Sequence, residues 1–157
     1  MNIGIIVLFF NHEEQLQFKN IFKNIENIEL CFVNNGSKDD TLGMLKYIKN
    51  EFLPNAHIID IKKTVQPDAA IRAGSRYFYN IKELYYIGYI HANEFKDFNK
   101  INTLLDEFNM HKKTLLNATT KKNKIAHKIE RKSCNKVFSV LDKLTKFQAH
   151  KKLNFIS

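Results

Sequence analysis

Short apolar runs alternate with longer amphipathic stretches through the first part of the chain. The apolar runs have the length and the β-branched content of strands buried on both faces, and they occupy residues 3–10, 30–33, 57–61 and 85–90. The stretches between them place apolar residues at mostly helical spacing, over residues 13–25, 40–52 and 68–79. This alternation predicts an α/β fold with a mostly parallel sheet flanked by helices.

The pattern becomes weaker after residue 91. Residues 98–110 predict a helix, and residues 114–118 predict a short strand. Residues 125–147 predict an amphipathic basic helix or helix pair, whose apolar face carries Ile125, Ile129, Val137, Leu141 and Leu144. No internal repeat or linker divides the chain. We therefore expect one domain over residues 1–157, with an α/β core in residues 1–110 and a reduced basic part in residues 111–157.

The excess positive charge lies at one end of the chain. The formal net charge is +9, and residues 121–157 hold eleven Lys and Arg against only Glu130 and Asp142, so the preceding residues sum to zero. This asymmetry indicates an anionic partner at the C-terminal end, such as an anionic membrane surface. A nucleic acid is the less favoured partner, because the basic segment has few aromatic residues and no known binding motif. The alternative is a charged face that only keeps the protein in solution.

The cysteines and the lengths of the apolar stretches bear on where in the cell we expect the protein. Cys31 and Cys134 are far apart, in an apolar run and in a basic segment, which suggests neither a disulfide framework nor a metal site. No apolar stretch approaches the roughly 18 to 20 residues of a membrane span, and no signal peptide is visible. We expect a cytoplasmic protein. The histidines, including His12, show no helical His-to-His ligand spacing and receive no role.

Polar residues and a glycine follow the second predicted strand. The segment Asn34-Asn35-Gly36-Ser37 enters a predicted helix, and ligands of open α/β sheets bind where such loops meet, at the carboxyl ends of strands. The amides of Asn34 and Asn35 offer both donors and acceptors to a base or a ribose. The alternative is an ordinary turn in which Asp39 or Thr41 caps the helix. The segment on its own leaves both interpretations open.

Several segments together resemble the family 2 glycosyltransferases, especially the polyprenyl-phosphate sugar synthases. Residues 10–14 (Phe-Asn-His-Glu-Glu) are similar to their Tyr-Asn-Glu-Glu element, and residues 33–41 to their Val-Asp-Asp-Gly-Ser-x-Asp-x-Thr element. Residues 69–74 (Ala-Ala-Ile-Arg-Ala-Gly) match the second half of a Gly-Lys-Gly-Ala-Ala-x-Arg-Ala-Gly helix start. The resemblance covers residues 3–108 and is faint after residue 129, where residues 136–138 and 154–157 take the places of a helix and a closing strand.

The resemblance implies a GT-A fold, which is a Rossmann-like nucleotide-binding domain, and a nucleotide sugar of the UDP or GDP type as the ligand. It also implies a set of nucleotide-binding residues, carried over from the matching motifs: Phe10, Asn11, Glu13, Asn34, Asn35, Gly36, Ser37, Arg72 and Gly74. It implies a lipid-phosphate or saccharide acceptor at the cytoplasmic face of a membrane. It assigns no catalytic residue.

The chain departs from the family where the family binds metal. An Asp-x-Asp element there holds Mg²⁺ or Mn²⁺ against the sugar diphosphate, but here His91 and Asn93 take its place. An imidazole and an amide bring no negative charge, so we expect these ligands to be lost and name no metal or other cofactor. The first Asp of the base-binding element has likewise become Asn34.

Two hypotheses follow. In the first, the protein transfers a sugar with reduced or metal-independent activity, and a cationic side chain, Arg72 or a protonated His91, stabilises the diphosphate leaving group. In the second, the protein is a non-catalytic relative that binds a partner glycosyltransferase or acts as a subunit in polysaccharide or glycolipid assembly. The alternation of strands and helices over residues 3–90 separately predicts a parallel core in which Asn11, Asn34, Gly36 and His91 gather at one edge of the sheet.

Overall fold

The computed structural model describes residues 3–17, 22, 27–81, 84, 86–121 and 136–154. Five parallel strands form one sheet in the order β3-β2-β1-β4-β5. The strands are β1 (Ile3–Phe9), β2 (Ile28–Asn35), β3 (His57–Ile61), β4 (Tyr86–His91) and β5 (Lys136–Ser139). The predicted α/β fold with a parallel sheet is confirmed.

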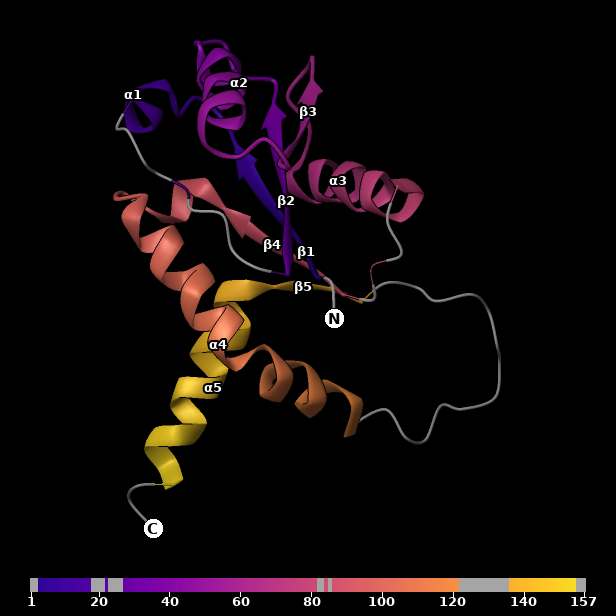
Figure 1. The fold of residues 1–157 in the computed structure, drawn as a ribbon, viewed down its shortest axis with the longest axis vertical. Helices are drawn as coiled ribbons and strands as arrows, with labels where there is room; N and C mark the ends of the chain where they lie inside the picture. The colour runs from indigo at the N-terminus through magenta and orange to yellow at the C-terminus, as the bar shows by residue number, and fades with distance from the viewer. Residues whose placement is uncertain are drawn as a thin grey trace.

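The helices cover both faces of this sheet (Figure 1). Their bounds are α1 (Glu13–Leu16), α2 (Thr41–Phe52), α3 (Pro67–Ile81), α4 (Asn99–Lys121) and α5 (Val140–Asn154), with a 3₁₀ turn η1 (Ala92–Glu94) after β4. Helix α3 lies on one face of the sheet, whereas α4 and α5 lie side by side on the other. No helix in the described part of the chain is long and apolar enough to cross a membrane.

The central strand β1 is buried on both faces of the sheet. All seven of its residues are buried, because successive side chains point to opposite faces and both faces are covered. Ile5 and Val7 belong to the larger core, with α2, α4 and α5, whereas Ile6 and Leu8 belong to the smaller core under α3. The continuous apolar run at the start of the sequence is thus the signature of the middle of the sheet.

Three sequence predictions about secondary structure are wrong. The predicted helix 13–25 ends at Leu16, and Phe22 is not helical. The ring of Phe22 instead packs 5.0 Å from the ring of Phe32 and 6.1 Å from that of Phe9, measured between ring centroids. The predicted strand 114–118 belongs to α4, because Leu115 and Leu116 continue the helical spacing of the buried residues Leu105 and Phe108.

The third wrong prediction concerns the C-terminal part. Residues 125–147 do not form one continuous amphipathic helix, because β5 occupies Lys136–Ser139 and extends the sheet beside β4. Residues 136–138, which the resemblance placed in a helix, therefore belong to a strand. Helix α5 then begins at Val140, which is fully buried, and Leu144 is buried one turn later. Residues 125–135 lie outside the described residues.

A substitution at Gly36 tests how tightly the loops at the edge of the sheet are packed. It has a φ of +69°, and an added Cβ would collide with the backbone of Lys63 and Thr64. We expect Gly36→Ala to lower the free energy of unfolding by about 1–3 kcal/mol, the cost of a strained backbone. Urea denaturation measures this change.

Gly43→Ala is the matched control. The three atoms nearest to a Cβ at Gly43 are the carboxylate atoms of Asp40, whose side chain is exposed and flexible. Because Gly43 lies in α2, alanine there should leave stability unchanged or raise it by up to about 1 kcal/mol. Equal losses in both variants would contradict the special constraint at Gly36.

Candidate functional site

The carboxyl ends of the four strands β1 to β4 meet at one edge of the sheet. Phe9 pairs with Asn34, and Asn34 pairs with Asp60 on its other side. Leu8 pairs with His91 in β4. Asn11 and Gly36 follow β1 and β2 directly, so the predicted gathering of Asn11, Asn34, Gly36 and His91 at one edge is confirmed.

Hydrogen bonds join the loop after β1 to the loop after β2. The backbone N–H of Asn11 donates to Ser37 Oγ (3.0 Å), and the N–H of Lys38 donates to Asn11 Oδ1 (2.9 Å). The N–H of His12 donates to Thr41 Oγ1 (2.7 Å). We call this set the loop clamp, formed by residues 11–13 on one side and residues 37–41 on the other.

Two carboxylates complete the loop clamp. Asp39 accepts hydrogen bonds from the backbone N–H of Glu13 (3.1 Å) and of Thr41 (3.1 Å), and Glu13 accepts one from the N–H of Asp40 (2.9 Å). Burial raises the pKa of Asp39, but the hydrogen bonds from Thr41 and Glu13 favour the charged form more strongly, so its pKa lies below the ordinary value. Asp39 therefore bridges the starts of α1 and α2 as a carboxylate.

His12 is the buried residue at the centre of the loop clamp. Its Nδ1 accepts a hydrogen bond from the N–H of Phe10 (3.0 Å), which requires that this nitrogen carry no proton. Its ring packs against Phe9 and Phe98, with centroids 5.9 and 5.5 Å away. Burial lowers the pKa of His12, and Asp39 offsets only part of that shift. His12 is a neutral structural residue, which the sequence spacing of the histidines did not reveal.

Asn34 and Asn35 point to opposite faces of the sheet and have different partners. Asn34 donates from Nδ2 to Asp60 Oδ1 (2.8 Å) and accepts from the hydroxyl of Ser37. Asn35 donates from Nδ2 to the carbonyl of Val65 (2.9 Å) and accepts from the N–H of Val65 (3.1 Å). The side chain of Asn35 thus holds the connection between β3 and α3.

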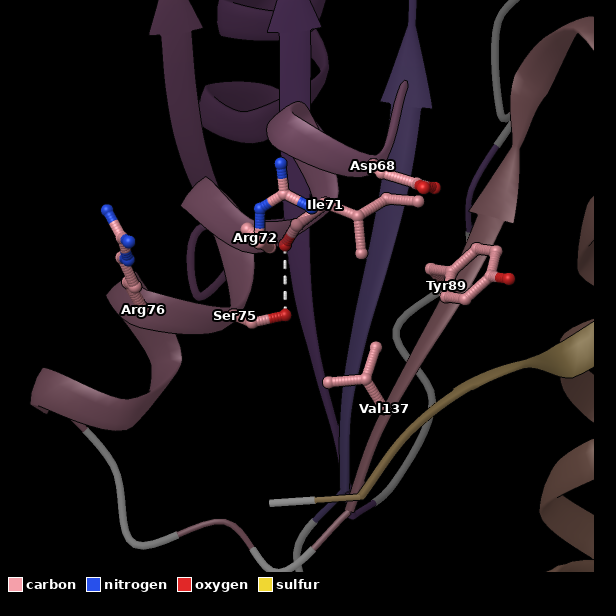
Figure 2. A pocket seen from close by; sticks show the side chains of 7 residues that line it. All are labelled: Asp68, Ile71, Arg72, Ser75, Arg76, Tyr89 and Val137. Atoms are coloured by element: carbon pink, nitrogen blue, oxygen red, sulfur yellow. Dashed lines mark hydrogen bonds between the residues drawn. The ribbon is translucent and has the colours of Figure 1, made fainter. Parts of the chain in front are cut away.

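A cavity of about 310 Å³ lies between α3 and the sheet (Figure 2). Ile71 and Arg72 line it from α3, and Tyr89 and Val137 line it from β4 and β5. Arg76 also lines it, but its side chain points away from Tyr89 and Val137. Tyr89 is in edge contact with the ring of His91, with centroids 5.4 Å apart. Burial raises the pKa of Tyr89, and the nearby carboxylates of Asp142, Asp68 and Glu94 add to the shift.

The structure distributes the predicted site residues over three places. The first is the loop clamp and its neighbours, with Phe10, Asn11, Glu13, Asn34, Gly36 and Ser37. The second is the opposite face, where Arg72, His91 and Asn35 lie. Gly74 is apart from both, since it is buried where α3 packs on Ile6 in the middle of β1. Asp60 is a site residue that the sequence did not single out, and the sequence gave His12 no role and Thr41 only that of a possible helix cap.

The sequence model of a known family matches most of the chain. Its description is glycosyl transferase family 2, and the match covers residues 5–153. The chain belongs to glycosyl transferase family 2. This membership confirms the resemblance seen in residues 3–108 and extends it through α5. No match is found among curated protein sequences.

Among solved structures, the similarities to S. aureus TarS are weak. Residues 1–349 of S. aureus TarS are 15% identical to this chain, with a TM-score of 0.45, over 71% of this chain and 33% of that chain. A longer TarS structure gives 17% identity and a TM-score of 0.41, over 58% and 16%. Crystal structures of TarS 1–349 in complex with UDP and with UDP-GlcNAc align similarly. The chain spans about a third of the length of TarS 1–349.

The residues after β4 do not fit the divalent cation that the family resemblance implies. His91 ends β4, and Asn93 and Glu94 follow in η1, so this place holds one carboxylate. Among the described residues, no three His, Cys, Asp or Glu side chains are grouped closely enough to hold a metal ion. Mg²⁺ sites of this kind combine one or two carboxylates with substrate phosphates, so the one carboxylate here supplies less negative charge than an Asp-x-Asp pair.

A pH series tests the neutral state of His12. Because its pKa is lowered in the folded state, the unfolded chain binds a proton that the folded chain does not. The contribution to stability is therefore fully present above pH 6.5, the ordinary value, and is lost as the pH falls below it. We expect His12→Phe to retain the ring packing and to show a smaller loss of stability on acidification.

Urea denaturation from about pH 7.5 to about pH 5.5 measures both slopes, since this window brackets the ordinary pKa of histidine. His12→Phe lacks the acceptor for the N–H of Phe10, so its stability should be lower throughout. The test lies in the slope rather than in the absolute stability. Parallel curves for the two proteins would show that another group causes the acid sensitivity.

Proposed function

We propose that this chain binds a nucleotide sugar at the carboxyl edge of its sheet and transfers the sugar to an acceptor. The observation that carries the proposal is its membership of glycosyl transferase family 2 over residues 5–153. The position of the loops supports it, because ligands of open parallel sheets bind outside the carboxyl ends of the strands. UDP- and GDP-sugars are the donors to test first.

The base and ribose would meet the edge at Phe10 and at the Asn34 region. Phe10, directly after β1, is 42% exposed, so its ring offers a flat surface on which a base can stack. The polar groups of Asn11, Glu13 and Ser37 are engaged within the loop clamp. These residues therefore set the shape of the nucleotide site, and Gly36 allows the loop after β3 to approach it.

The diphosphate would be stabilised by a cationic side chain in place of a metal. Arg72 is exposed at the wall of the cavity beside Tyr89, and His91 contacts the same tyrosine. A guanidinium binds phosphate oxygens through two parallel hydrogen bonds and is always charged. Charge that develops on the leaving diphosphate during sugar transfer would then be neutralised by Arg72.

Isothermal titration with UDP- and GDP-sugars tests this proposal. We expect one class to bind equally well with EDTA and with Mn²⁺, because the carboxylates that would hold the ion are lost. Arg72→Gln should weaken binding about 10- to 100-fold, the value of a charged hydrogen bond. Arg76→Gln removes the same charge one turn further along α3 and should have little effect. Binding that requires Mn²⁺ would contradict the role of Arg72.

The same variants separate the two functional hypotheses. Release of the nucleoside diphosphate from the bound nucleotide sugar, measured over time, identifies a transferase whose activity is metal-independent. Stable binding without turnover in the presence of acceptors would favour a non-catalytic relative that works with a partner glycosyltransferase. This second function is supported by one observation: Asn34, His91 and Asn93 stand where the family has acidic residues.

The acceptor in this proposal is a lipid phosphate at the cytoplasmic face of a membrane. The net charge of residues 121–157 is +9, which suits an anionic surface, and each basic residue near such a surface contributes about 1 kcal/mol. The buried side chains of Val140 and Leu144 show that part of this segment serves the core. Membrane contact would therefore rest on charge.

Sedimentation with vesicles tests the membrane proposal. We expect the protein to pellet with anionic vesicles at low salt and to be released as the Debye length falls from about 30 Å at 0.01 M to about 8 Å at 0.15 M salt. Neutral vesicles are the control and should leave it in the supernatant. A protein that stays in the supernatant with anionic vesicles at low salt would exclude charge-driven attachment and leave a saccharide acceptor.

A further inference from the structure

Strand β3 is an outer strand of the sheet, and among the described strands it pairs only with β2 (Figure 1). A parallel strand that is bonded on one side directs the N–H and C=O groups of alternate residues to the other side. The outer side of β3 therefore presents backbone donors and acceptors to which no described strand is bonded. A row of such groups can bind one more strand from another chain.

The side chains of β3 are mostly apolar although the strand is open on one side. Three of its five residues are isoleucines, and all five residues are only partly buried. Ile58 packs against the larger core, whereas Ile59 and Ile61 pack against the smaller core under α3. An apolar outer strand is a place where a further strand adds readily.

A groove of about 470 Å³ follows the outer side of β3, with His57 at the start of the strand and Lys62 beyond its end among its lining residues. Tyr77 lines it from α3, and the tyrosine hydroxyl lies 3.1 Å from His57 Nδ1. Helix α2 supplies the other wall, with Leu42, Lys46, Lys49 and Asn50. Five residues of strand are about 17 Å long, so β3 can pair with a segment of about five residues.

The groove carries positive charge. Its lining includes Lys46, Lys49 and Lys62 against the single carboxylate of Asp60, which gives a formal charge of +2. Asp60 pairs with Lys62, whose side chain is 85% exposed. Lys46 and Lys49 form no ion pair with another described residue. Their two ammonium groups are the charges that the groove offers to a partner.

The sign of this charge decides between the possible occupants of the groove. A second copy of β3 would bring its own lysines against the same set, and like charges across a pair of strands are destabilising. Lysines beside an outer strand prevent pairing between copies in this way. Residues 121–157 have a net charge of +9, so the groove also repels the chain's own C-terminal segment. An acidic segment of another protein is attracted instead.

We propose that an extended acidic segment of a partner protein binds along the outer side of β3 as an additional strand. The backbone of β3 supplies the hydrogen bonds that hold the segment, and the ammonium groups of Lys46 and Lys49 bind its carboxylates. The groove shares no lining residue with the cavity beside Arg72. The inference therefore goes beyond the proposed function and does not depend on nucleotide binding.

Fluorescence anisotropy with three labelled peptides tests the proposal at low salt. The first peptide alternates valine with glutamate, and the second alternates valine with lysine. The third has the sequence of the first but carries a methyl group on every backbone nitrogen, which removes the backbone donors and keeps the charge. We expect only the first peptide to bind, because the second has the wrong charge and the third cannot pair as a strand. Its affinity should fall as the salt concentration rises.

Two double variants test the contribution of the lysines. Lys46→Gln with Lys49→Gln should weaken the first peptide about 2- to 30-fold, the value of two exposed ion pairs. Lys100→Gln with Lys113→Gln removes the same charge from exposed positions of α4 and should have little effect. Circular dichroism and thermal unfolding establish that the compared proteins are folded.

Hydrogen exchange of the backbone amides distinguishes an added strand from a simple anion site. A strand paired with β3 slows exchange in residues 57–61, whereas inorganic pyrophosphate, the probe for an anion site, leaves these amides unchanged. Slower exchange in residues 57–61 with the first peptide alone supports the inference. Equal binding of the first and third peptides, or a first peptide that binds no better than the second, would overturn it.

Discussion

The candidate site depends on the need to satisfy backbone N–H groups at the starts of α1 and α2. These groups have no partner within their helices, and the loop clamp supplies partners for several of them. Thr41 and Asp39 accept from the start of α1, while Glu13 and Asp39 accept from the start of α2. Because each loop satisfies the other, neither can move alone, and the edge of the sheet keeps its shape around Phe10 and Gly36.

This constraint determines which polar groups are left for a ligand. The carboxylates of Asp39 and Glu13 and the side chain of Asn11 have structural partners, and the amide of Asn35 is bound to the backbone of Val65. The groups that face the outside are of another kind: an aromatic ring at Phe10, a guanidinium at Arg72 and an ammonium group at Lys46. They lie around the clamp rather than within it.

The C-terminal elements complete the fold. Strand β5 extends the sheet beside β4, and the helix after it buries Val140 and Leu144 in the larger core. On the opposite face, the described helix α3 lies over β1, β2 and β3, so Tyr89 and Val137 stay partly exposed beside it. Among the described residues, Arg72 of α3 lines a cavity together with Tyr89 and Val137 of this part of the sheet.

The sequence by itself determined the fold class and most of the strands. Residues 3–9 are all apolar, so as a strand they must be covered on both faces of the sheet. The polar residues and the glycine turn after β2 predict the end of a strand at the edge where ligands bind. The local pattern was sufficient in both places. The tertiary structure alone decided the end of α1 at Leu16, the strand at Lys136–Ser139, and the roles of His12, Asn35 and Asp60. The strand and the three side-chain roles depend on partners more than twenty residues away, such as Thr41 for His12, Asn34 for Asp60 or Tyr86 for Lys136. Hydrogen bonds and ring contacts between distant residues leave no periodic trace in the sequence.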